Sequence, residues 1–249
     1  MQETLPQERR RRKLPKMSKK HYYIVVDVET TSTYKGESRF DLVYDCGIAV
    51  CDRVGTIYEK KSYILRDIFH KEKLMSSAYY AQKIPQYEID IQNGIHKEVS
   101  LNYLRKVFQS LIEKYNVVAV CAYNASFDRS ALNKTALWFS KGTQKFFSDD
   151  MPFYCIWHMA AQVICNKKGY IDFCKRNNFV SEKGNISTSA ETVYKFLSKD
   201  PDFTECHTGL KDVEIEVAIM TECFRKHEKM QKGINTMCWK IPQEKARQA

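Results

Sequence analysis

The sequence predicts an α/β fold in which helices flank a mixed β-sheet made of an antiparallel three-strand meander plus parallel strands. Two short apolar runs, Ile24–Val26 and Val117–Ala122, are typical of buried strands. Residues 42–65 have the pattern of a β-hairpin, with a glycine in the connection. Amphipathic helices are expected directly after the second apolar run and again between residues 208 and 226.

The N-terminal half should hold the antiparallel part of the sheet. A polar loop containing Gly36 is expected over 34–39, after the first strand. Residues 42–51 and 56–65 then form two strands, joined by the turn at 52–55. The first three strands therefore form a meander. The mixed pattern of residues 67–94 predicts short helices, with Pro85 as a break.

The central part should add parallel strands. Ser100 can cap a helix over 101–116, whose apolar residues recur at helical spacing. The strand 117–122 is followed at once by a helix over 125–139, an order that favours a strand running parallel to its neighbour. Residues 153–157 predict a further strand, which leads into a helix over 158–165.

The C-terminal part is mainly helical. Residues 166–202 look helical in pieces, with Ser189 directly before the stretch 190–197 and Pro201 closing the segment. A long helix is expected over 208–226, and the last twenty residues give no clear pattern. We therefore divide the chain into a tail (1–20), one main domain (21–228) and a C-terminal extension of uncertain structure (229–249).

Charge and composition narrow the function classes. The net charge is +10, but residues 1–20 hold eight basic and two acidic side chains, so the other 229 residues carry only +4. The tail is expected to be disordered and dispensable for chemistry, and Met17 is an alternative natural start. Nine scattered cysteines favour a reducing, cytoplasmic location, and no apolar run suits a membrane span. A zinc site at Cys155, His158, Cys165 and Cys174 is disfavoured because no paired knuckle is present.

Two acids, Asp27 and Glu29, stand at the end of the first predicted strand. Because side chains alternate along a strand, both carboxylates project from the same face. Such a pair repels unless a cation lies between them, which makes a divalent metal site the first hypothesis. An exposed polar strand end is the alternative.

Three more charged residues stand at junctions where they can join that pair. Asn124 is a candidate N-cap, and Asp128 lies in the first turn of the following helix, at the carboxyl end of a strand. Asp212 shares a helix side with apolar residues, so it should be partly buried and needs a partner. His207 lies just outside that helix; taken alone, it is most simply a surface histidine.

Together, three motifs resemble the DEDDh (DnaQ-like) family of 3′-to-5′ exonucleases, within the RNase H-like superfamily. DVETT supplies Asp27 and Glu29, YNASFD supplies Asp128, and HTGLKD supplies His207 and Asp212. Four residues separate His207 from Asp212, which is the spacing of the histidine branch of the family. The chain departs from a minimal member in a long segment over 173–206, and in having Gly209 where alanine is frequent.

The resemblance implies a two-metal hydrolase that uses Mg²⁺ or Mn²⁺. It implies that Asp27, Glu29, Asp128 and Asp212 hold the two ions, with Asp27 bridging them, and that His207 takes the proton from the attacking water. The product would be a nucleoside 5′-monophosphate. Residues around Thr30 and Thr31 are expected to touch the last sugar, and Phe127 or a nearby tyrosine to stack on a base. Asn124 is a further expected substrate contact.

Several functional alternatives stay open at this point. The partner is the 3′ end of DNA or RNA, with single-stranded DNA favoured and an exoribonuclease like ribonuclease T or oligoribonuclease as the alternative. A non-catalytic nucleic-acid-binding protein on the same fold is disfavoured, because all five catalytic positions are present. A polymerase or replication partner is compatible with this class, and no membrane is expected.

Overall fold

A computed structural model describes residues 20–31, 41–76, 78 and 80–248 of the chain. The loop expected over 34–39 and nearly all of the basic tail, including Met17, lie outside these residues. Within the described part, no helix has the length and the apolar run that crossing a bilayer requires.

The centre of the fold is a six-stranded sheet with the order β4-β3-β2-β1-β5-β6. The strands β1, β2 and β3 pair antiparallel, while β4 pairs parallel with β3, and β5 and β6 continue parallel from β1. The predicted meander with added parallel strands is therefore confirmed. The strand bounds are β1 Tyr22–Thr30, β2 Val43–Asp52, β3 Ile57–Leu65, β4 Lys97–Val99, β5 Ala119–Ala122 and β6 Phe153–Cys155.

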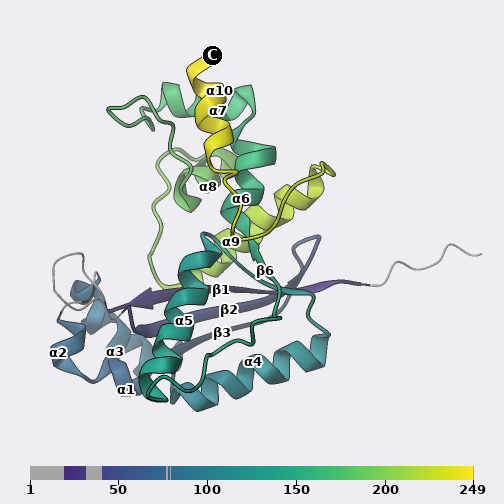
Figure 1. Ribbon diagram of the computed structural model, residues 1–249. Coiled ribbons are helices and arrows are strands. Elements are labelled where there is room, and N and C mark those ends of the chain that lie inside the picture. The colour runs from purple at the N-terminus through teal and green to yellow at the C-terminus, as the bar shows by residue number, and fades with distance from the viewer. Residues whose placement is uncertain (1–19, 32–40, 77, 79, 249) are drawn as a thin grey trace, which may run out of the picture.

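Helices lie on both faces of the sheet (Figure 1). Short helices follow β3 and form one end of the molecule: α1 Arg66–Phe69, α2 Glu72–Met75, the 3-10 turn η1 Ala81–Lys83 and α3 Ile84–Gln92. The helices α4 Leu101–Tyr115 and α5 Ala125–Phe139 share one face. The rest belong to the other side: α6 Ile156–Ala160, the π-helical turn η2 Ala161–Cys165, α7 Lys168–Arg176, α8 Ala190–Ser198, α9 Gly209–Arg225 and α10 Lys240–Gln248.

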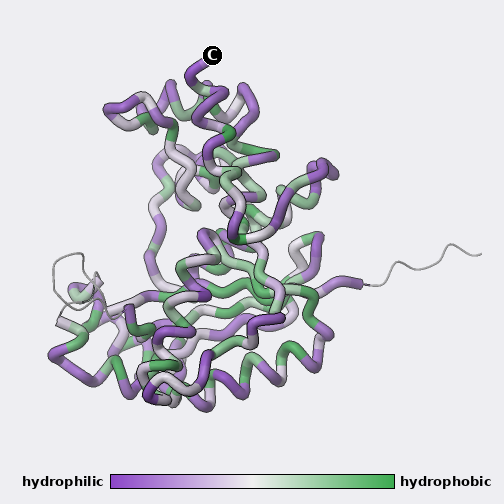
Figure 2. Tube along the Cα trace, viewed as in Figure 1, coloured by the Kyte–Doolittle hydropathy of each residue, from purple (hydrophilic) through white to green (hydrophobic). Residues whose placement is uncertain are grey.

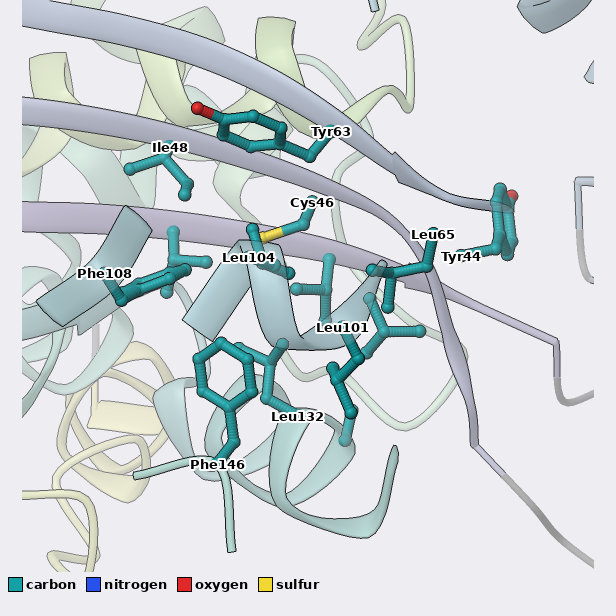
Figure 3. Close-up of a cluster of buried hydrophobic side chains, with 14 of the residues drawn as sticks. Tyr44, Cys46, Ile48, Tyr63, Leu65, Leu101, Leu104, Phe108, Leu132 and Phe146 are labelled. Carbon is teal, nitrogen blue, oxygen red and sulfur yellow. The ribbon is translucent and has the colours of Figure 1, made fainter. Parts of the chain in front are cut away.

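Alternation along β1 divides the interior into two cores. Ile24 and Val26 face the core that includes α4 and α5, shown in Figure 3, whereas Tyr23 and Val25 face the core that includes α6 to α9. The strands accordingly form the hydrophobic centre of the chain in Figure 2. Asp27 and Glu29 are the next odd-numbered residues of β1 after Tyr23 and Val25. They therefore lie on the same face of the sheet, which is the face that α9 covers.

The cap prediction at Ser100 is confirmed, and Ser189 caps the helix that it precedes. The Ser100 side chain accepts a hydrogen bond from the Tyr103 amide at the start of α4, and Ser189 does the same for Thr192 at the start of α8. Two elements were not predicted. The strand β4 is only three residues long, and α10 lies in the segment that gave no clear sequence pattern.

Candidate active site

The strand β1 carries the first two carboxylates of the site. Its antiparallel register with β2 places Asp27 opposite Gly47 and Glu29 opposite Asp45. Directly opposed residues of an antiparallel pair share a face, so all four positions lie under α9. Parallel pairing with β5 covers only Tyr23 to Val25 of β1. The end of β1 therefore projects beyond β5, as expected for a site at this sheet edge.

Two glycines let α9 approach this strand pair closely. A Cβ atom added to Gly47 would lie 1.9 Å from the carbonyl oxygen of Gly209. One added to Gly209 would lie 2.6 Å from the Gly47 nitrogen and 3.0 Å from the Asp27 carbonyl oxygen. The first turn of α9 thus rests directly on the backbone beside Asp27. This contact also explains the glycine in HTGLKD, since a side chain there has no room.

The carboxylate of Asp45 fixes the start of α9. It accepts hydrogen bonds from the Gly209 amide at 3.0 Å and from the Tyr87 hydroxyl at 2.8 Å. The Thr208 side chain does not cap the helix, so Asp45 takes the place of a local N-cap. Asp45 was not predicted as part of the site. The sequence did hold a signal for this role: Asp45 is an acid within an apolar strand, and a buried carboxylate needs hydrogen-bond partners.

As a result, three predicted acids meet at one place. Carboxylate oxygens of Asp27, Glu29 and Asp212 all lie within 4.8 Å of one another. Asp212 is buried, as its helix position predicted. Burial, followed by repulsion from neighbouring acids, raises the pKa of Glu29 to about 9 and that of Asp27 well above its ordinary value. Burial also raises the pKa of Asp212 to about 7.

Asp128 approaches the cluster from α5. It is buried, and burial raises its pKa to about 8, opposed by backbone hydrogen bonds that include one from Val28. Val28 lies between Asp27 and Glu29 on β1, so Asp128 reaches the same strand end. Asn124 occupies the predicted N-cap position of α5, although its backbone is left-handed (φ 63°) and its side chain makes no capping hydrogen bond.

The donor set fits hard divalent cations. It consists of carboxylate oxygens, the ligands that Mg²⁺ and Mn²⁺ prefer. The Oδ1 atom of Asp212 is buried and has no hydrogen-bond partner among the described residues, so it is available as a ligand. A cation would also relieve the repulsion that raises the pKa values of Asp27 and Glu29.

His207 lies beside the cluster and belongs to a second group of side chains. Its ring stacks on Tyr80, with centroids 4.9 Å apart and an interplanar angle of 16°. A ring nitrogen lies within 4.8 Å of carboxylate oxygens of both Glu191 and Glu205. Burial and the nearby Lys83 lower the pKa of His207, while Glu191 opposes this shift. A lowered pKa keeps the imidazole neutral at physiological pH, as a proton acceptor must be.

The other predicted substrate contacts differ in exposure. Phe127, in the first turn of α5 beside Asp128, is 41% exposed. By contrast, Thr30 and Thr31 are buried at the end of β1, with the Thr31 amide bonded to the Leu42 carbonyl. Phe127 is therefore the best placed of these residues to stack on a base.

Besides Asp45, two more charged residues of the site were not predicted. Lys83 donates hydrogen bonds to the carbonyl oxygens of Cys206 and His207, the second at 3.0 Å, although it lies far away in the sequence. Nothing in the local pattern indicated this role. Glu216, one turn after Asp212 on α9, is buried, and its Oε2 has no hydrogen-bond partner in the described part of the chain. Its place beside Asp212 on the buried side of a helix was a signal that sequence reasoning did not use.

The disfavoured zinc site has no support among the described residues. No metal-competent group includes Cys155, Cys165 or Cys174. His158 lies instead against Thr236, whose hydroxyl is 2.7 Å from the His158 Nδ1 atom.

Comparisons with known proteins support the fold. No protein-family model and no curated protein matches the sequence. Solved structures do match. One is the nuclease domain of 3′hExo, a DEDDh family member, bound to rAMP. It has a TM-score of 0.54 at 13% identity, and the match covers 87% of this chain and 98% of that domain. A 3′-exonuclease that recognises the histone mRNA stem-loop has a TM-score of 0.56 at 13% identity, covering 87% of each chain.

Escherichia coli exonuclease I, in complex with a dT13 oligonucleotide, has a TM-score of 0.50 at 12% identity. The match covers 80% of this chain but only 39% of exonuclease I, so the chain spans about two fifths of that protein's length. The mixed sheet with its flanking helices is thus the fold of the DEDDh 3′-exonucleases.

Proposed function

We propose that this protein is a metal-dependent 3′-to-5′ exonuclease that hydrolyses terminal phosphodiesters of nucleic acid to nucleoside 5′-monophosphates. One observation carries the proposal. Carboxylates from two distant segments, Asp27 and Glu29 on β1 and Asp212 on α9, come within 4.8 Å of one another at the edge of an exonuclease-like sheet. A buried cluster of like charges is costly unless it binds cations, which points to a functional role.

In the proposed reaction, Asp27, Glu29, Asp128 and Asp212 hold two Mg²⁺ or Mn²⁺ ions. When bound, such ions activate the nucleophile and neutralise charge on the phosphate. His207 accepts the proton from the attacking water at its imidazole. Phe127 stacks on a base near the 3′ end, and residues around Thr30, Thr31 and Asn124 border the terminal nucleotide.

Single-stranded DNA is the favoured substrate, and RNA is the alternative. The matched structures give examples of both, since exonuclease I is bound to a DNA oligonucleotide and a matched 3′-exonuclease recognises an mRNA stem-loop. A polymerase or replication partner stays a prediction.

Parallel digests test the activity and the substrate together. Single-stranded DNA, duplex DNA and RNA oligonucleotides of matched sequence, each labelled at the 5′ end, are incubated with the full chain and Mg²⁺. We expect a ladder of 3′-shortened products, fastest on single-stranded DNA, which EDTA abolishes. No shortening of any of the three would refute the nuclease assignment and favour a non-catalytic binding protein on the same fold.

A further inference from the structure

The segment between α7 and α9 supplies two acids to the surroundings of His207. Glu191 lies in the first turn of α8, and Glu205 lies in the connection to α9. The His207 Nδ1 atom is 3.8 Å from Oε2 of Glu205. Both carboxylates offer an oxygen within 4.8 Å of a His207 ring nitrogen.

These two acids are held in place by their own partners. An oxygen of Glu191 accepts a hydrogen bond from the Glu205 amide at 3.2 Å, which joins the connecting segment to α8. Lys195, one turn later on α8, forms an ion pair with Glu191 at 2.6 Å. The cap of α8 by Ser189 fixes the turn that carries Glu191. Glu205 therefore lies in a defined place although it is outside any helix.

The other sides of His207 are also fixed. Tyr80 stacks on the ring, and Lys83 holds the His207 carbonyl oxygen at 3.0 Å. The His207 backbone is left-handed, with φ 49°, a conformation that costs free energy for a residue other than glycine and needs such support. The His207 backbone is thus held from η1, and its ring is held from the turn before η1 and from the acids of α8 and the following connection.

We propose that Glu205 and Glu191 are positioning residues for His207. The Glu205 carboxylate lies on the Nδ1 side of the ring, and the Glu191 carboxylate lies within 4.8 Å of a ring nitrogen, so that Nε2 is left as the nitrogen that accepts the proton of the attacking water. They then stabilise the imidazolium that this transfer creates, as a carboxylate does for a general-base histidine elsewhere. The long segment before α9 thereby acquires a role in the reaction. This inference rests on the proposed function only in its kinetic part.

The pairing itself can be measured without any substrate. In the metal-free full chain, ¹H–¹³C NMR follows the six histidines through a pH titration, and the His207 signal is assigned by its loss in His207→Asn. The charged groups near the ring are Lys83, Lys195, Glu191, Glu205 and Asp212. Removing two facing carboxylates in Glu191→Gln/Glu205→Gln should lower the His207 pKa by about one unit.

Two variants keep this result interpretable. Asp202→Asn removes an acid from the same connecting segment, but the Asp202 side chain is exposed, so the His207 pKa should not change. Glu205→Asp keeps the carboxylate and should retain most of the wild-type pKa. If the double variant keeps its thermal transition and the His207 pKa equals that of the wild type, the pairing is refuted, whether or not the protein is a nuclease.

Kinetics then test the catalytic consequence. In the double variant, kcat should fall about 10- to 100-fold with KM nearly unchanged, because a misoriented base weakens the transition state and leaves substrate binding intact. The acidic limb of the kcat profile should move to lower pH together with the His207 pKa. An acidic limb that stays in place while kcat falls indicates only a structural role and overturns the proposal, as does an unchanged kcat. A wild type without activity contradicts the proposed function instead, and the NMR titration still decides the pairing.

Discussion

The substitution Gly47→Ala probes how the site is assembled, since it adds a single methyl group. The new Cβ would lie 1.9 Å from the Gly209 carbonyl oxygen, 2.0 Å from its carbonyl carbon and 2.6 Å from the Leu210 nitrogen. All three atoms belong to the backbone of the first turn of α9, so no side-chain rotation relieves the clash. Ordinary contact begins at 3.4 Å, which leaves the oxygen too close by about 1.5 Å.

The first turn of α9 must therefore shift by about 1 Å or more, and Asp212 moves with it away from Asp27 and Glu29. A displacement of about 1 Å in a catalytic constellation costs about 100-fold in rate. Overpacking of this kind also costs about 1–3 kcal/mol of unfolding free energy. For a chain of this size, that cost lowers the Tm by about 2–12 °C.

The assay compares Gly47→Ala with Gly169→Ala. A Cβ on Gly169, in α7, meets nothing within 4 Å, so this control should keep the wild-type Tm and activity. Circular dichroism gives the Tm, with and without Mg²⁺, and digestion of a 5′-labelled oligonucleotide gives the rate. We expect Gly47→Ala to lose both activity and most of the Mg²⁺-induced rise in Tm. Wild-type behaviour of Gly47→Ala would refute the close packing of α9 on β2 as the origin of the site.

Three further predictions concern stability. The pKa values of Glu29 and Asp128, about 9 and about 8 in the fold, are above their ordinary values, so the folded chain retains protons that the unfolded chain releases. The unfolding free energy that these two protonated carboxyl groups contribute is complete below about pH 4 and is lost as the pH rises towards about 9. The loss is about 1.4 kcal/mol per pH unit for each retained proton. Thermal unfolding in EDTA should show this decline and Mg²⁺ should flatten it; parallel curves in the two buffers would count against cation binding. Asp45→Ala should destabilise the protein by about 3 kcal/mol in urea unfolding, because the Gly209 amide and the Tyr87 hydroxyl lose a buried acceptor, and a loss below about 1 kcal/mol would contradict that anchoring role. Ser100→Ala should cost about 1 kcal/mol in the same assay and leave activity intact, since it removes only the cap of α4; a large loss of activity would mean that α4 shapes the site.

Local sequence patterns predicted most of the fold and part of the site. The period of two along β1 placed Asp27 and Glu29 on one face, and the helical period placed Asp212 on the buried side of α9. The strand–helix order predicted that β5 runs parallel to a neighbouring strand. The structure shows that this neighbour is β1, which brings Asp128 to the same edge. These inferences succeeded because each depends on a short, regular segment.

Contacts between distant segments could not be predicted in the same way. The bond from Gly209 to Asp45 joins residues 164 apart, and that from Lys83 to the His207 carbonyl joins residues 124 apart. Neither of these two hydrogen bonds follows from the periodic pattern of a single helix or strand. The left-handed backbone of Asn124 likewise follows from how β5 leads into α5, whereas asparagine before a helix ordinarily favours a capping side chain.

The central claim is that the carboxylate cluster supports hydrolysis from the 3′ end. Its most direct test compares wild type with Asp27→Ala on one single-stranded DNA oligonucleotide labelled at the 5′ end, with Mg²⁺ present. We predict a 3′-to-5′ ladder for the wild type, none with EDTA and none for Asp27→Ala, while Asp202→Asn behaves as wild type. Equal ladders from wild type and Asp27→Ala would contradict the assignment of this cluster as the active site.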